Sequence, residues 1–153
     1  MLAVVIAVAV ALLVLRPWET ATVEIAGQQV PETIGELEID EHYDTPFGPG
    51  PPPGTDVEHV VHLRYVSAEE IAYVSVYGPT EDVEAVMAHR ANPRDVAGAR
   101  CADSSMRDEF PICAVAADGR VLTAIGYSVT TGDFRSEEGQ ANLAHTVAEA
   151  FLS

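Results

Sequence analysis

The spacing of apolar residues follows a period of two in the middle of the chain. Residues 57–66 and 71–78 are rich in β-branched and aromatic side chains, and the second stretch places Ala72, Val74 and Val76 on one face. Such alternation is typical of half-buried strands. The polar run from residue 67 to residue 70 predicts a short turn between them, so we expect two neighbouring strands here.

The period changes to that of a helix in residues 80–93. Val83 and Met87 are four positions apart, and Thr80 is placed to cap the first turn. The dipeptide Asn92-Pro93 predicts where this helix ends, because proline cannot continue the hydrogen-bonding pattern.

A second helix is predicted for residues 136–152. Ser136 is a suitable N-cap, and Leu143, Val147 and Phe151 recur every four residues to form an apolar stripe. An amphipathic helix of this kind buries its stripe against other elements, and a sheet is the partner we expect.

Three further strands are predicted between the two helices, in residues 96–103, 110–119 and 120–129. The last two are joined through Asp118-Gly119, a dipeptide that accepts the positive φ angles of a tight hairpin turn. The resulting order, ββα-βββα, predicts an α+β fold, a mostly antiparallel sheet with two helices packed on it.

The first fifteen residues carry no polar side chain. A helix that ran on to Trp18 would be about 27 Å long, close to the ~30 Å hydrocarbon core of a bilayer. No basic residue precedes the segment, and Arg16-Pro17 follows it in place of a small-residue cleavage site. An uncleaved transmembrane helix over residues 1–18 is therefore favoured over a cleaved signal and over a buried core helix.

Residues 19–56 differ in composition from the rest of the chain, and we interpret them as a linker region. The first part is acidic, with at most a short strand in residues 20–30, and residues 45–56 contain five prolines and three glycines. That density of proline and glycine favours an extended spacer of polyproline II character. The globular domain is expected to occupy residues 57–153.

The chain is strongly acidic. It has 24 acidic residues against 8 basic ones, all of them arginine, and a formal net charge of −16. The residues after Arg16 hold the 24 acidic and 7 of the basic side chains, a formal charge of −17. A surface of this sign repels phosphate groups, which argues against nucleic acid as a partner. Adaptation to high salt and recognition of cations are both open as the reason for the charge.

Cys101 and Cys113 are the only cysteines, with eleven residues between them. This spacing lacks the short knuckle of a zinc site and the C-x-x-C pair of redox enzymes. On two neighbouring strands the thiols can meet as a structural disulfide, and two buried free thiols are the main alternative. Because disulfides persist in oxidising compartments, the first interpretation places the domain outside the cytoplasm, although Arg16 alone favours the cytoplasmic side.

Three histidines are the other candidates for chemistry. His59 and His62 would share a face in a helix, but they point to opposite faces in the predicted strand. His42 lies among four carboxylates in residues 38–44, without the ligand spacing of a calcium-binding loop. The sequence also lacks a nucleophile elbow and a glycine-rich phosphate loop. We therefore assign no catalytic, cofactor-binding or metal-binding residue.

Three short segments, VSVYGPTEDVEAVMA, GARC and ICAVAADGRV, give the chain a family resemblance. They are similar to segments of a loose group of small, uncharacterised actinobacterial proteins with one transmembrane segment, a low-complexity linker and a CAWAD-like cysteine strand. The matching positions include Tyr77-Gly78, Cys101 and Cys113-Ala114, whereas Val115 stands where the group has tryptophan. The resemblance implies a membrane-anchored location and a disulfide, and no activity.

These features together predict a single-pass membrane protein whose C-terminal domain lies outside the cytoplasm. We expect a non-enzymatic interaction or sensing function in the cell envelope, with the membrane and an envelope protein as partners. The alternative is a cell-surface hydrolase or a metal-dependent enzyme that uses His59, His62 or the acidic residues around His42. The sequence does not define the oligomeric state.

Overall fold

The computed structural model describes residues 20–41, 52–104 and 110–153, and its centre is an eight-stranded antiparallel sheet. The strands of this sheet are β3 (Thr33–Ile34), β4 (Leu37–Ile39), β5 (His59–Val66), β6 (Glu70–Gly78), β7 (Ala91–Val96), β8 (Ala99–Asp103), β9 (Pro111–Ala117) and β10 (Arg120–Ser128). They lie in the order β3-β4-β5-β6-β10-β9-β8-β7. A separate hairpin is formed by β1 (Thr22–Ile25) and β2 (Gln28–Pro31), and the helices are α2 (Val83–Met87) and α3 (Glu137–Leu152). The predicted fold class, a mostly antiparallel sheet with two helices, is confirmed at this level.

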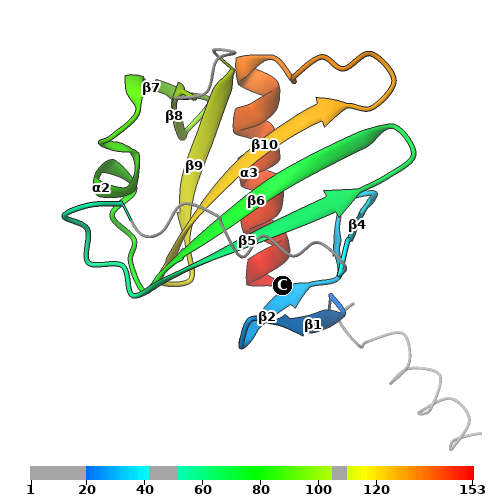
Figure 1. Cartoon of the computed structure of the whole chain (residues 1–153), viewed down its shortest axis with the longest axis horizontal. Helices are drawn as coiled ribbons and strands as arrows, with labels where there is room; N and C mark the ends of the chain where they lie inside the picture. The colour runs from blue at the N-terminus through cyan, green and yellow to red at the C-terminus, as the bar shows by residue number, and fades with distance from the viewer. Residues whose placement is uncertain (1–19, 42–51, 105–109) are drawn as a thin grey trace, which may run out of the picture.

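One face of the sheet carries the main core. The helix α3 runs across the strands on this face (Figure 1), where Leu143 and Val147 pack with Leu122 of β10 in one cluster of buried side chains. The side chain of Ser136 accepts a hydrogen bond from the backbone N–H of Gly139 at 3.1 Å and so caps the helix. The predicted C-terminal helix, its cap and its apolar stripe are confirmed.

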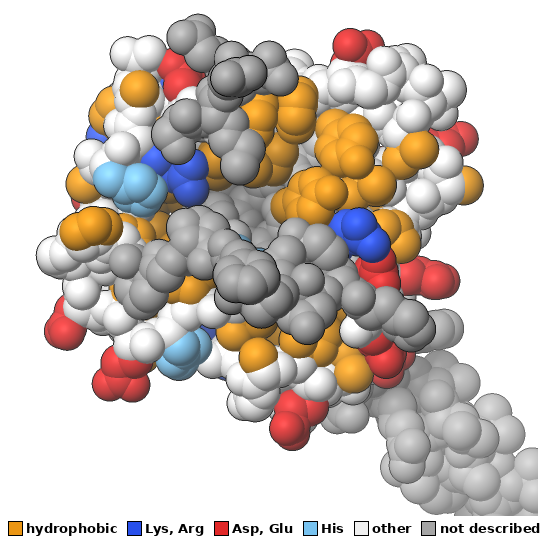
Figure 2. Space-filling model, in the orientation of Figure 1, with side chains coloured by type: hydrophobic (Ala, Val, Ile, Leu, Met, Phe, Trp, Pro, Cys, Tyr) orange, Lys and Arg blue, Asp and Glu red, His pale blue; other side chains and the backbone are white. Residues whose placement is uncertain are grey.

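The opposite face of the sheet is covered at one end by α2. Val86 and Met87 of this short helix pack against Tyr77, Ile112 and Val121, which the alternation of their strands turns away from α3. Figure 2 looks onto this second face and shows acidic side chains spread around its rim. The fold therefore has a main core under α3 and a smaller core on the other side of the sheet.

The hairpin between β9 and β10 turns at Asp118-Gly119. Both residues have positive φ, 51° and 69°, and Ala117 lies opposite Arg120 at the start of the paired strands. These are the features of the two-residue turn whose twist matches that of the flanking strands. The predicted hairpin is confirmed.

The order of elements after β4 is ββα-ββββα, with one strand more than predicted. Where we expected one strand in residues 96–103, the chain forms β7 and β8, which reverse at Ala97 (φ 48°) and Gly98 (φ 80°). The additional strand contains Asn92 and Pro93, which the sequence pattern favoured as a helix end. Proline is tolerated there because β7 is an edge strand of the sheet, and a backbone N–H on its outer side has no neighbouring strand to bond to.

The helix α2 is shorter than predicted and begins later. Its N-cap is Asp82, whose carboxylate accepts from the N–H of Ala85 at 2.9 Å, and it ends at Met87. Thr80 instead accepts from the N–H of Asp82 at 3.1 Å, outside the helix. The pattern Thr-Glu-Asp offers two candidate caps close together, and the second one is used.

The range that we interpret as a linker from its composition, residues 19–56, contains the strands β1 to β4. Val30, Ile34 and Leu37 from this range are at most 5% exposed and belong to the main core under α3. Tyr65 of β5 donates a hydrogen bond to the carbonyl of Pro31 at 2.9 Å, and burial raises the pKa of this phenol above its ordinary value. The strands β3 and β4 have two and three residues, too few for a periodic pattern to mark them.

The predicted transmembrane segment, residues 1–18, and most of the predicted Pro/Gly-rich spacer lie outside the described residues. Within residues 20–41, 52–104 and 110–153, no helix combines the length and the apolar character needed to cross a membrane.

Candidate functional site

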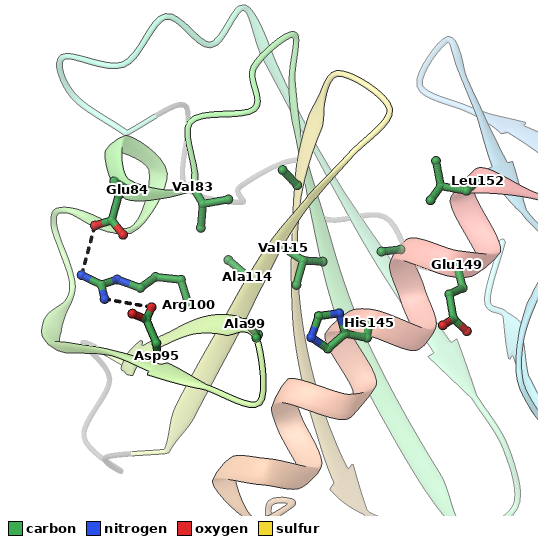
Figure 3. A pocket seen from close by; sticks show the side chains of 13 residues that line it. Val83, Glu84, Asp95, Ala99, Arg100, Ala114, Val115, His145, Glu149 and Leu152 are labelled. Atoms are coloured by element: carbon green, nitrogen blue, oxygen red, sulfur yellow. Dashed lines mark hydrogen bonds and ion pairs between the residues drawn. The ribbon is translucent and has the colours of Figure 1, made fainter.

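A groove of about 490 Å³ lies where β8 and β9 separate (Figure 3). The strand β8 pairs with β9 only between Arg100 opposite Ala114 and Asp103 opposite Pro111. The strand β9 continues to Ala117 in register with β10. The last residues of β9 therefore have a partner strand on one side and the groove on the other.

The turn at Ala97-Gly98 opens the groove. Because β8 begins only after this turn, it has no residues left to pair with the end of β9. This turn is attached to α3 through His145, whose Nε2 lies 2.9 Å from the carbonyl oxygen of Ala97. A carbonyl can only accept, so Nε2 carries the proton of this hydrogen bond. A Cβ added to Gly98 would lie 3.5 Å from the same ring nitrogen.

The backbone of Ala116 faces the groove. Ala117 and Arg120 flank the two-residue turn and exchange both of their hydrogen bonds, and such pairs alternate along an antiparallel ladder. Val115 therefore bonds to β10, whereas the N–H and C=O of Ala116 point the other way. Continuing the β8 register would place Gly98 opposite Ala116, but Gly98 belongs to the turn, so no strand of the described chain pairs there.

Small and apolar side chains form the floor of the groove. They come from α2, β8, β9 and α3, namely Val83, Ala99, Ala114, Val115, Ala116 and Ala148. Because most of them end at Cβ, the backbone of β9 is accessible from the groove, and Ala116 is itself exposed. Leu152, near the end of α3, also lines the groove and is 64% exposed.

The rim of the groove is acidic. Arg100 is bound by Glu84 of α2 at 3.1 Å and by Asp95 of β7 at 3.0 Å, as the dashed lines in Figure 3 show. Glu149 lies on the opposite wall, one helical turn beyond His145. Three carboxylates and one arginine therefore line the groove, which leaves the lining with a negative formal charge.

A network of polar groups fixes the β7–β8 hairpin to the start of α3. Arg94 of β7 forms ion pairs with Asp103 of β8, at 2.8 Å, and with Glu137 of α3. Asn92 donates a side-chain hydrogen bond to Asp103 at 2.6 Å. The hydrogen bonds from Asn92 and Arg94 lower the pKa of Asp103 below its ordinary value of 3.8.

The shifted pKa of Asp103 predicts a dependence of stability on pH. Because the folded pKa lies below the unfolded one, Asp103 stabilises the fold above pH 3.8, and this contribution is lost as the pH falls through the folded pKa. We expect Asp103→Asn to be less stable than the wild type at neutral pH, with the difference closing in acid. Urea unfolding of both proteins from about pH 7 to about pH 2 measures this. A difference that stays constant over this range would contradict the assignment.

The structure places the two cysteines together. Cys101 of β8 lies directly opposite Cys113 of β9, with an S–S distance of 2.05 Å, and both residues are fully buried beneath α3. The pair is at disulfide distance, as predicted. The cysteine pair lies next to the groove, where β8 and β9 are still paired. It therefore holds the two strands together at the point from which they separate.

The structure does not bring the candidate histidines together. His59 contacts the side chain of Gln28, whereas His62 lies 2.9 Å from Ser75 Oγ through its Nδ1. They occupy odd and even positions of one strand and therefore face opposite sides of the sheet. His42 lies outside the described residues, and within the part of the chain that is described no group of three His, Cys, Asp or Glu side chains is arranged to hold a metal.

The sequence pattern did not indicate the groove or its lining. The dipeptide Ala97-Gly98 was the one local signal, since glycine readily adopts the positive φ of a turn. Compared with protein-family models, with curated proteins and with solved structures, the chain matches none.

Proposed function

We propose that this chain is a membrane-tethered, extracytoplasmic interaction module of the cell envelope that binds a partner in the groove between α2, β9 and α3. The observation that carries the proposal is the composition of the groove. Its one arginine, Arg100, and its one histidine, His145, are already bound to neighbouring groups of the protein. What the groove offers to a partner is an apolar floor and a strand edge, which suit binding better than catalysis.

The proposed location rests on two features. The disulfide-distance pair Cys101–Cys113 lies in the core, and a disulfide persists only where the environment is oxidising. The apolar residues 1–15 are nearly long enough to span a bilayer. A domain held at the outer surface of a membrane by such a segment is exposed to envelope proteins and not to cytoplasmic ones.

A topology experiment tests the location. We expect a C-terminal alkaline phosphatase fusion of the full chain, expressed in bacteria, to be active, because that enzyme folds only outside the cytoplasm. The fusion should stay in the membrane pellet after washing at alkaline pH. A matched fusion without residues 1–18 should be soluble and inactive.

Two outcomes would contradict the proposal in different ways. An inactive phosphatase fusion together with a fluorescent cytoplasmic reporter at the same position would place the domain inside the cell. An active but fully soluble fusion would mean that the apolar segment is a cleaved signal and not a tether.

A further inference from the structure

We infer that the groove binds an extended, cationic peptide segment of a partner protein, which adds to the free edge of β9 as a short strand. The inference rests on the proposed function and specifies the chemistry of the partner. It is carried by three observations: the unpaired backbone of Ala116, the alternating walls of the groove and the charge of its rim.

The first observation is the strand edge. The N–H and C=O of Ala116 point away from β10 into the groove. An extended peptide lying where β8 would have continued places one residue opposite Ala116 and exchanges two hydrogen bonds with it, as in other cases of strand addition. A strand rises about 3.3 Å per residue, so the edge from Val115 to Ala117 accommodates about three residues.

The second observation is that the groove has two different walls. In an extended peptide the side chain of the central residue points to one face of the strand, and the side chains of its two neighbours point to the opposite face. One face meets His145, Glu149 and Leu152 of α3, and the other meets Val83 and Glu84 of α2. A peptide in which basic and apolar residues alternate can therefore satisfy both walls.

The third observation is charge. Glu84, Asp95 and Glu149 outnumber Arg100 around the groove, and the whole chain carries a formal charge of −16. A second copy of the chain brings the same negative charge to the same edge, so repulsion disfavours self-association there. A cationic partner is attracted, and the long stem of an arginine or lysine that reaches Glu149 can pack on the exposed Leu152.

The test uses the full chain in nanodiscs of zwitterionic lipid and three fluorescent peptides. The first peptide is Val-Arg-Val-Arg-Val, the second has proline in place of its central valine, and the third has glutamate in place of both arginines. Fluorescence anisotropy should show binding of the first peptide, weakening with added salt. The proline peptide should bind about tenfold more weakly because it lacks a central N–H, and the glutamate peptide should not bind.

Two variants locate the binding. Ala116→Pro removes the edge N–H without removing a hydrogen bond to β10, and we expect it to weaken binding about tenfold. Glu149→Lys should weaken binding about fivefold at low salt, whereas Glu24→Lys, an equal charge change at an exposed position of β1, should leave it unchanged. Hydrogen exchange at the Ala116 amide should slow when the arginine-valine peptide is bound.

The remaining outcomes each overturn the inference. Absence of binding by the first peptide, or equal binding by the wild type and both groove variants, would exclude the groove as the site. Equal binding of the proline peptide would exclude strand addition, and a dimer of the free protein that Ala116→Pro dissociates would identify a second copy as the occupant. The phosphatase assay is independent of the peptides, so an active, membrane-bound fusion together with any of these results would remove this inference and leave the proposed location of the domain standing.

Discussion

Reduction of the Cys101–Cys113 disulfide is expected to lower the free energy of unfolding by about 3 kcal/mol. The two cysteines are 12 positions apart, and closing a loop of that size removes conformational freedom chiefly from the unfolded chain. The reduced thiols remain small apolar groups in a buried site, so the folded state changes little. Urea unfolding of the full chain in detergent, with and without reductant, measures the difference.

The matched control is the variant Cys101→Ala/Cys113→Ala, on which reductant should have no effect. Intact mass of the exported protein should show the loss of two thiol hydrogens, and both cysteines should resist alkylation until reductant and denaturant are added. Identical unfolding curves for oxidised and reduced wild type would contradict the stabilising role. Full alkylation of the exported protein without reductant would show two free thiols, the alternative that the sequence left open.

The size of this effect bears on where the domain can work. A domain of this kind is stabilised by only about 5–15 kcal/mol in total, so a loss of about 3 kcal/mol is a large fraction. The disulfide also joins β8 to β9 next to the groove, where β8 turns away. In a reducing compartment we therefore expect the domain to have a lower free energy of unfolding. We also expect the separation of β8 from the end of β9 to be less fixed.

Local chemistry explains which elements the sequence predicted. Asp118-Gly119 defines its hairpin because the turn demands positive φ at two adjacent residues. The apolar stripe of α3 likewise needs no knowledge of its partner to be recognised. Ala97-Gly98 adopts the same conformation as Asp118-Gly119, but alanine is an unusual residue for it, and the turn was missed.

The groove could not be predicted because it depends on register. The groove exists because the pairing of β8 with β9 ends at Arg100, whereas β9 runs on to Ala117. The relative extent of two strands joined through a disulfide-closed loop is not marked by any local sequence pattern. No residue of its floor is unusual by itself, since all are alanines and valines. A binding edge made of backbone has no side-chain motif in the sequence.

Replacement of Gln140 by methionine is expected to lower the free energy of unfolding by about 2 to 3 kcal/mol. Gln140 is fully buried in α3, where its Oε1 accepts from the N–H of Gly126 at 2.8 Å and its Nε2 donates to the carbonyl of Gly126 at 2.9 Å. The carbonyl also accepts from the N–H of Arg135 at 3.0 Å. The variant therefore leaves one buried donor without a partner and removes one further hydrogen bond.

The reason for this arrangement lies in β9. Continuing the β9–β10 register past Cys113 and Ala124 places Pro111 opposite Gly126. Proline has no N–H, so the ladder cannot be completed there by the strand itself. The side-chain amide of Gln140 supplies one donor and one acceptor to Gly126, as a residue of β9 would. It does so from the helix α3.

Two further measurements separate this role from ordinary packing. Methionine fills nearly the same volume as glutamine, so the loss reports hydrogen bonding and not a cavity, and Asn142→Met, at an exposed position of the same helix, should change the stability by less than about 0.5 kcal/mol. Hydrogen exchange at the Gly126 amide should accelerate in Gln140→Met by more than the global loss of stability accounts for, because that N–H loses its acceptor. An unchanged exchange rate at Gly126 would mean that another group replaces Gln140, and that the sheet does not depend on the helix to complete its ladder at this point.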